Sequence, residues 1–171
     1  MSCYRQILVA HDGSTDANAA LEHAVRLARD QHACLTLLTV APFPHAPASM
    51  GASATPDPVD SFRVAHGRAV DSVPDDVGLR TLILRGDPAQ LILDTARDGG
   101  HDLIVMGSHG HGRLHRALLG SVSLRVLHDS RVPVLFMRRK GGDGGEAEVV
   151  ESRSPDQVEE QRAAAGDGAI A

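Results

Sequence analysis

Short apolar runs alternate with helical patterns through most of the chain, and this alternation constrains the fold more than any other feature. The apolar runs lie at 7–10, 33–40, 79–86, 101–108 and 132–139. The stretches between them with apolar residues at helical spacing are 14–31, 60–73, 87–100 and 121–130. Because the runs are apolar on both faces, they are typical of parallel strands that helices cover on both sides. The sequence therefore predicts an α/β fold with an open, five-stranded parallel sheet.

Right-handed crossovers with one reversal after the third strand predict the strand order 3-2-1-4-5. This order places the loops after the first and fourth strands side by side at the carboxyl edge of the sheet. Open parallel sheets bind ligands at such a reversal, so these two loops are the predicted site.

Composition divides the chain into two parts. Residues 1–140 suit one domain, whereas 141–171 form a low-complexity acidic segment that is predicted to be disordered. The overall net charge of −5 comes from this segment, because residues 1–140 are nearly neutral. A nearly neutral domain gives no support for a nucleic-acid-binding surface. The Pro-, Ala- and Ser-rich stretch 41–58 is predicted to be a flexible loop.

Three features lead us to expect a cytoplasmic protein. No apolar run approaches the length of a membrane span, and the first residues lack a signal-peptide pattern. Cys3 and Cys34 lie in apolar runs and form no disulfide framework, so we expect buried free thiols in a reducing compartment.

The glycine-rich stretch MGSHGHGRLHRALLGSVS at 106–123 has the chemistry of a phosphate site. Gly107 and Gly110 lack a Cβ, so several backbone N–H groups could approach a phosphate. Gly120 precedes a helix, whose N-terminal N–H groups form a second anion-binding edge. The hydroxyls of Ser121 and Ser123 could add hydrogen bonds. The alternative is a flexible surface connection.

Asp12, in the loop after the first strand, faces the same crevice in this topology. A carboxylate there suits a ribose hydroxyl better than a phosphate. The alternative is a turn residue of the Asx type before the first helix.

Other interpretations of the loop fit less well. A Walker A loop needs a lysine, and the only lysine is Lys140. A Rossmann fingerprint would follow the first strand, and GHGRLH lacks its third glycine. The histidines at 109, 111 and 115 match no strong zinc spacing and are interpreted as solvated loop residues that could lie near phosphates. Arg113 and Arg116 could reach a γ-phosphate or simply be exposed.

Ser108 and His109 are not expected to form a nucleophile–base pair, since adjacent side chains seldom point at each other.

The spacing Gly107-x₂-Gly110-x₉-Gly120-Ser121 resembles the ATP-binding motif of the universal stress protein family. Further blocks that resemble the family occur in its order at 7–14, 33–40, 86–96, 102–110 and 131–138. The resemblance covers residues 4–139. It implies a Rossmann-like sheet of the adenine nucleotide alpha hydrolase type and a homodimer formed through the last strand, 132–138.

The resemblance also implies the role of particular residues. Asp12 would contact the ribose, and Val40 would contact the adenine through its backbone. The ribose and phosphates of ATP, with or without Mg²⁺, would be surrounded by Met106, Gly107, Gly110, Gly120, Ser121 and Val122. Two departures from the family pattern are His11, which could crowd or polarise the mouth of the pocket, and the Pro-rich stretch 41–58.

Three functions remain open at this point. The first is an ATP-binding stress-response regulator in which any ATPase activity is slow and secondary. The second is an ATP hydrolase or phosphotransferase that uses the Arg and His residues of the loop. The third is a nucleotide-free dimeric adaptor. Neither a membrane nor a nucleic acid is an expected partner.

Overall fold

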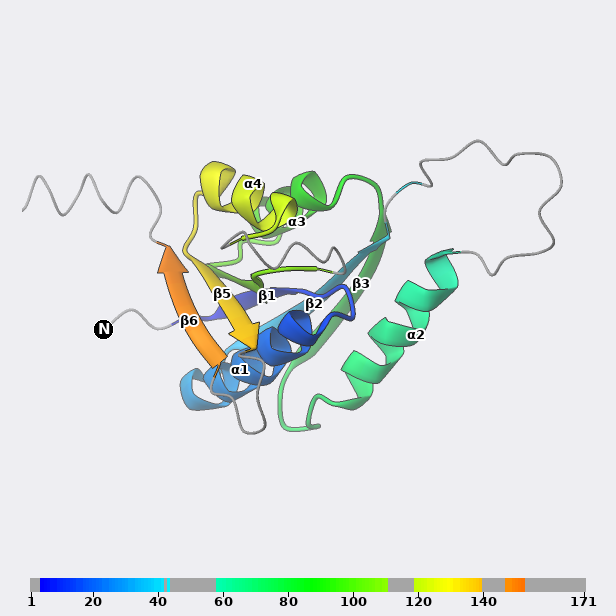
Figure 1. Cartoon of the computed structure of the whole chain (residues 1–171). Coiled ribbons are helices and arrows are strands. Elements are labelled where there is room, and N and C mark those ends of the chain that lie inside the picture. Colours follow the sequence, from blue (N-terminus) through cyan, green and yellow to red (C-terminus); the bar gives the residue numbers. More distant parts are fainter. Residues whose placement is uncertain (1–3, 42, 44–57, 111–118, 140–146, 153–171) are drawn as a thin grey trace, which may run out of the picture.

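The computed structural model of the protein describes residues 4–41, 43, 58–110, 119–139 and 147–152, which form one sheet with helices on both faces (Figure 1). The strand order is β3-β2-β1-β4-β5-β6. The first five strands are parallel, so the predicted order 3-2-1-4-5 is confirmed. Their bounds are β1 (Gln6–Ala10), β2 (Cys34–Ala41), β3 (Leu79–Arg85), β4 (Leu103–Gly107) and β5 (Val134–Arg139).

β1 is buried on both faces because helices cover each side of the sheet. Ile7 and Val9 of β1 belong to the core on one face, and Leu8 belongs to the core on the other. All three side chains are fully buried. The double burial explains why this strand is a continuous apolar run and not an alternation of apolar and polar residues.

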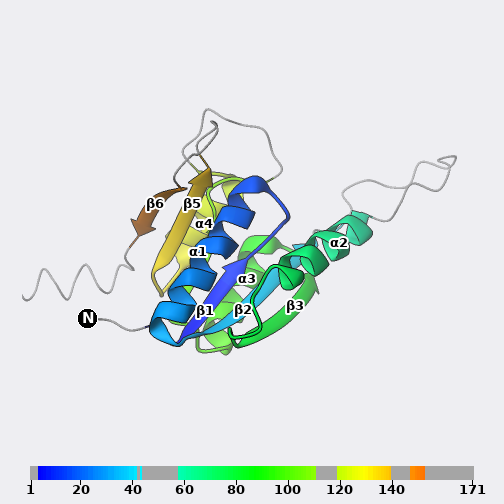
Figure 2. The same cartoon turned by 90° about the horizontal axis from the view of Figure 1, so that it is seen from below.

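Two helices lie on each face of the sheet (Figures 1 and 2). α1 (Thr15–Gln31) and α2 (Pro58–Asp71) contribute to one core, and α3 (Pro88–Asp98) and α4 (Ser121–Asp129) contribute to the other. Ser14 caps α1 by accepting a hydrogen bond from the Ala17 N–H, and Asp87 caps α3 by accepting one from the Gln90 N–H. These caps fix the helix starts, which follow the carboxyl ends of β1 and β3.

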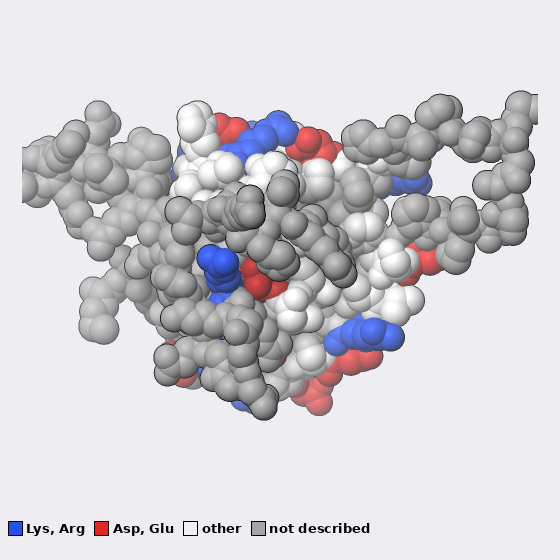
Figure 3. Space-filling view, in the orientation of Figure 1, with Lys and Arg blue, Asp and Glu red and all other residues white. Residues whose placement is uncertain are grey.

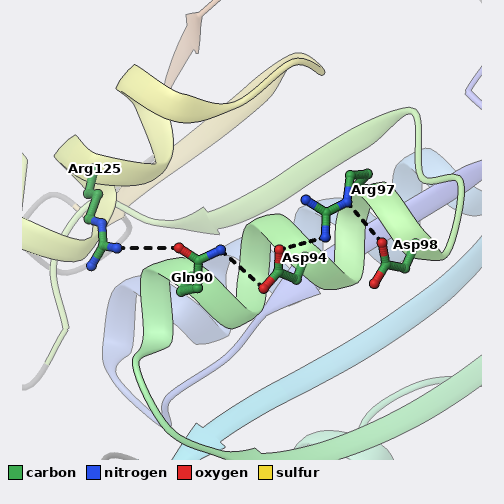
Figure 4. Close-up of polar contacts among 5 residues, drawn as sticks. All are labelled: Gln90, Asp94, Arg97, Asp98 and Arg125. Carbon is green, nitrogen blue, oxygen red and sulfur yellow. Dashed lines mark hydrogen bonds and ion pairs between the residues drawn. The ribbon is translucent and has the colours of Figure 1, made fainter.

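A chain of polar contacts runs along the exposed side of α3 (Figure 4). Gln90 accepts a hydrogen bond from Arg125 of α4 and donates one to Asp94. Arg97 then donates to both Asp94 and Asp98. These contacts connect α3 to α4, although exposed ion pairs of this kind contribute little to stability.

A sixth strand lies within the segment that was predicted to be disordered. β6 (Ala147–Ser152) pairs antiparallel with β5. The structure therefore differs from the prediction over these residues. The prediction was based on composition, which does not show that the edge of β5 offers backbone donors and acceptors to a further strand. β6 also occupies the edge through which the last strand was expected to dimerise. The other residues of 141–171 lie outside the described part.

Cys34 is exposed and free, whereas the sequence predicted a buried thiol. The prediction is wrong because Cys34 is the first residue of β2 and is exposed, whereas the residues that follow it in the strand are buried. Cys3, residues 44–57 and residues 111–118 lie outside the described part, and with them His111, His115, Arg113 and Arg116.

Charged side chains are dispersed over the face in Figure 3. Arg side chains of the described residues lie in separate groups there, with acidic side chains beside them. This is the pattern expected of a nearly neutral domain. None of the helices in the described ranges has the length and apolar composition needed to cross a membrane.

Candidate functional site

A pocket of about 540 Å³ opens at the carboxyl ends of β1, β2 and β4. Its floor comes from the strand ends, and its sides come from the first turns of α1, α3 and α4 together with Phe62 of α2. Such volumes are typical of small-molecule sites. The pocket therefore lies where the predicted reversal of strand order placed it.

The structure brings all the predicted site residues together in this pocket. Its lining includes Asp12, Val40, Met106, Gly107, Gly110, Gly120, Ser121, Val122 and Ser123. Val40 and Met106 are buried at the ends of β2 and β4. The loops after β1 and β4, which are far apart in the sequence, thus meet at one cavity.

Sequence reasoning missed several lining residues. His11 was noted only as a departure, and His109 was interpreted as solvated. Phe62, Pro88 and Ile92 enter the pocket from α2 and α3. No local signal identifies these three, because their contribution depends on how the helices pack over the sheet.

Asp12 forms the turn that the sequence gave as the alternative to a ligand contact, and it also reaches the glycine loop. Its Oδ1 accepts a hydrogen bond from the Ser14 N–H at 2.9 Å, which makes the Asx turn. Gly13 between them has φ +88°, a left-handed conformation that favours glycine. The other carboxylate oxygen reaches the glycine loop, since a Cβ added to Gly110 would lie 2.5 Å from Oδ2. Asp12 is therefore a turn residue that also lies at the junction of the two loops.

The structure shows a reason for glycine at position 107 that the sequence did not indicate. A Cβ at this position would lie 2.8 Å from the Ala17 nitrogen and 2.9 Å from the Asp16 carbonyl carbon. These backbone atoms belong to the first turn of α1, which packs directly on the end of β4. Glycine is required here by helix packing, whether or not a phosphate also approaches.

We expect Gly107→Ala to destabilise the fold and Gly120→Ala to leave its stability nearly unchanged. The Cβ that Gly107→Ala adds would force α1 to move, at a cost of about 1–3 kcal/mol. A Cβ at Gly120 meets no atom closer than 3.5 Å. Urea unfolding of the two variants tests the difference. If the two variants are equally stable, α1 can move at this contact without a measurable cost in stability.

The N-terminus of α4 forms another part of the pocket lining. Its N-cap, Gly120, has no side chain to bond the first N–H groups, and its own N–H donates to the Ser108 carbonyl at 2.8 Å. N–H groups at such a helix end attract anions. Ser123 is buried, and its hydroxyl donates to the Gly107 carbonyl at 3.1 Å. The Ser123 hydroxyl thus donates to β4, whereas the sequence analysis expected it to form a hydrogen bond with a ligand.

Ser108 and His109 meet despite being adjacent in the sequence. The Ser108 hydroxyl donates to Asp16 Oδ2 at 2.8 Å and lies 3.0 Å from His109 Nδ1. His109 Nδ1 and Asp16 Oδ2 are 3.7 Å apart. The expectation that the two side chains would not point at each other is wrong, because the first turn of α1 brings Asp16 against both. The Ser108 hydroxyl proton is directed to the Asp16 carboxylate and not to His109, so the two side chains do not form a nucleophile–histidine pair.

A second polar cluster, with buried His11, Thr39 and His66, lies between β1, β2, α1 and α2. His11 Nε2 lies 2.8 Å from Asn18 Oδ1, and His66 Nδ1 lies 2.8 Å from Thr39 Oγ1. His11 Nδ1 is a buried atom without a hydrogen-bond partner among the described residues. Burial lowers the pKa of His66 below its usual range, and the neighbouring His11 lowers it further.

This lowered pKa predicts a loss of stability in mild acid. The unfolded chain binds a proton at His66 near pH ~6.5, while the folded protein resists it, so the free energy of unfolding falls as the pH drops below that value. In His66→Gln the fall should be smaller, though not absent, because burial and then Arg26 lower the pKa of His23 as well. Urea unfolding across this pH range measures the slope. The control is His128→Gln, whose side chain is 88% exposed, and an unchanged slope in His66→Gln would contradict the prediction.

The family model described as Universal stress protein family matches residues 3–138. Universal stress protein YxiE of Bacillus subtilis is 33% identical over 155 residues, which cover 79% of this chain and 99% of that protein.

Solved structures agree with the fold. The universal stress protein UspA of Lactobacillus plantarum has a TM-score of 0.63 and 29% identity, covering 81% of this chain and all of that one. A universal stress protein solved in complex with cAMP has a TM-score of 0.57 and 27% identity, covering 79% of this chain and 97% of that one. The match therefore extends over the domain that carries the pocket.

Proposed function

Since the chain belongs to the universal stress protein family, we propose that it binds an adenine nucleotide, ATP in first place, in the pocket between the β1 and β4 loops. The nucleotide would act as a regulator of conformation or partner choice in a stress response. One observation carries the proposal: residues from the ends of β1, β2 and β4 and the start of α4, chosen from the sequence, all line one pocket.

The two ends of the pocket differ in chemistry, as a nucleotide requires. Ala10, Leu38 and Val40 provide an apolar wall that suits a purine ring. The glycine loop and the start of α4 provide backbone N–H groups that suit phosphates. Asp12 lies between these regions, where a ribose would present its hydroxyls. The relative in complex with cAMP makes an adenine nucleotide a reasonable ligand class for this fold.

Binding with slow or no hydrolysis is the form of the proposal that we favour. Phosphoryl transfer generally needs a metal ion, a cation that stabilises the developing charge and a positioned water. Among the described lining residues Asp12 is the only carboxylate, so Mg²⁺ would have to be held largely by the nucleotide itself.

The direct test is to identify what the purified protein carries. Denatured protein is expected to release an adenine nucleotide that mass spectrometry identifies. Isothermal titration of the ligand-free protein with ATP, AMP, cAMP and adenosine then ranks the ligands. Failure of all four to bind would overturn the proposal and favour an adaptor that works without a nucleotide.

Two further parts of the proposal concern assembly and location. A homodimer through residues 132–138 requires β6 to leave the edge of β5, because each strand edge pairs with only one neighbour. Light scattering of the full chain and of a variant without 141–171 distinguishes a dimer blocked by β6 from one that forms elsewhere.

The free thiol at Cys34 suits a reducing compartment such as the cytoplasm.

A further inference from the structure

Phe62 is an aromatic side chain that lines the pocket without being part of the core. It lies on α2 and is half-buried. Ala69 and Val70, further along the same helix, pack into the core beneath α1 and α2, whereas Phe62 belongs to neither of the two apolar clusters that form the core. Among the described lining residues it is the only Phe, Tyr or Trp. Core packing therefore does not account for an aromatic ring at this position.

A buried hydrogen bond fixes the level of α2 along β2. His66 Nδ1 lies 2.8 Å from Thr39 Oγ1, and both side chains are buried. Phe62 comes four residues before His66, so the two side chains project from the same face of the helix, one turn apart. α2 begins beyond the carboxyl end of β2 and runs back toward the start of β3 (Figures 1 and 2). The turn that carries Phe62 is therefore nearer to the carboxyl edge of the sheet than His66 is.

The rise of the helix and of the strand places Phe62 at the end of β2. Four helical residues advance about 6 Å, and two strand residues advance about 6.6 Å. Two residues beyond Thr39 is Ala41, the last residue of β2. The register of β1 with β2 ends earlier, at the pair of Ala10 and Leu38. Phe62 is thus about level with the part of β2 that extends past β1, where Val40 lines the pocket.

Apolar side chains from both faces of the sheet meet the pocket here. Phe62 comes from α2 on one face, and Pro88 and Ile92 come from the start of α3 on the other. Val40, on the strand between these layers, also lines the pocket. A planar group bound at the end of β2 would contact an aromatic ring from one helix and aliphatic side chains from the other. Aromatic rings gain energy from offset stacking beyond the burial of their area, so this arrangement favours a flat aromatic ligand.

We propose that Phe62 stacks on the base of the bound nucleotide and makes the pocket prefer purine to pyrimidine nucleotides. This inference rests on the proposed function and deepens it, because it names a residue that selects the base. Stacking on an aromatic side chain is open to every base, but the two fused rings of a purine present a larger face than the single ring of a pyrimidine. Phe62 contacts the base and not the phosphates, so it affects ATP and adenosine alike.

Isothermal titration of Phe62→Ala with ATP, adenosine and CTP tests the stacking. We expect ATP and adenosine to bind about tenfold more weakly than they bind the wild type, as for the removal of an aromatic side chain that stacks on a base. Both should lose the same factor, since both carry adenine. CTP should lose only about threefold because its ring is smaller, so the preference for ATP over CTP should fall about threefold.

Two further variants separate stacking from the filling of space. Phe62→Leu keeps an apolar side chain without a planar face, so it should bind ATP nearly as weakly as Phe62→Ala does. Phe62→Trp has a larger face and should bind ATP at least as tightly as the wild type. The chain has no Trp of its own, so the fluorescence of this variant reports on position 62 alone. ATP should quench it, and inorganic tripolyphosphate, which has no base, should not.

Val64→Ala is the matched control. Val64 lies on the same helix, is 55% exposed and is not among the described lining residues, so this variant should bind every ligand as the wild type does. Thermal melting of each variant confirms that folded proteins are being compared. Phe62→Ala should melt close to the wild type, because the ring is outside the core.

The outcomes that overturn the inference differ from those that overturn the proposed function. If Phe62→Ala binds ATP and adenosine as the wild type does, the ring does not contact the base, while the proposed function stands. Wild-type affinity in Phe62→Leu would show that the side chain only fills the pocket wall. Equal losses for ATP and CTP, or ATP binding without quenching in Phe62→Trp, also contradict the inference. If neither ATP nor adenosine binds the wild type, the proposed function fails and this inference fails with it.

Discussion

Gly120→Asp is expected to weaken ATP binding about 100-fold while the fold stays as stable as the wild type, a loss of about 2.7 kcal/mol in binding free energy. Asp is among the best N-cap residues, and Gly120 is the N-cap of α4 without a side-chain hydrogen bond. A Cβ there would meet the Ser108 carbonyl oxygen at 3.5 Å and the His109 Cα at 3.7 Å, which are ordinary contacts. The side chain can therefore be added without moving the backbone.

The loss of binding has two physical causes. The new carboxylate would accept hydrogen bonds from the helix N–H groups that a phosphate would otherwise use. It would also repel the phosphate charge, by about 4 kcal/mol at 4 Å for two unit charges in an environment of intermediate dielectric constant. Screening by salt and movement of the side chain reduce this value, so we expect about 100-fold.

Two controls isolate the charge. Gly120→Asn occupies the helix end in the same way but is neutral, so it should weaken ATP binding far less than Gly120→Asp. Gly120→Ala adds neither a cap nor a charge and should bind ATP nearly as the wild type does. Isothermal titration with ATP and adenosine measures the affinities. If Gly120→Asp binds ATP as tightly as Gly120→Asn, the phosphates do not lie at the start of α4.

Phe136→Ala is expected to lower the free energy of unfolding by about 3–5 kcal/mol, the largest stability effect that we predict. Phe136 lies on β5, is fully buried and belongs to the core beneath α3 and α4. The chain has only three Phe, one Tyr and no Trp, so other aromatic side chains cannot refill the space. The remaining cavity adds its own cost to the lost burial.

Phe43→Ala is the matched control, because the Phe43 side chain is 60% exposed. Urea unfolding followed by circular dichroism should show a large shift of the midpoint for Phe136→Ala and a small one for Phe43→Ala. Similar shifts for the two variants would mean that the core on this face collapses around the missing ring.

Local patterns in the sequence were sufficient for the four helices and first five strands of the described residues and for the backbone part of the site. Double burial makes β1 a continuous apolar run, and an Asp-Gly-Ser turn marks its end at Asp12, Gly13 and Ser14. A glycine before Ser121 marks the start of α4. Such signals depend on the conformation of a few adjacent residues, so they are readable without the rest of the fold.

Contacts between distant elements were not predictable in this way. Asp16 reaches Ser108 and His109 only because α1 packs on the end of β4, and the sequence separates these residues by more than ninety positions. Phe62 enters the pocket from a helix whose position depends on the sheet beneath it. Long-range packing of this kind has no fixed sequence spacing.

The sequence by itself determined that the chain forms a parallel α/β sheet with a glycine-rich loop at its carboxyl edge, because burial and turn formation impose short-range patterns. The tertiary structure alone decided three other matters. Gly107 is required by the close approach of α1, the ring of His109 is oriented by a carboxylate from another element, and the edge of β5 is covered by β6. Each depends on contacts between different elements, and local sequence patterns do not specify such contacts.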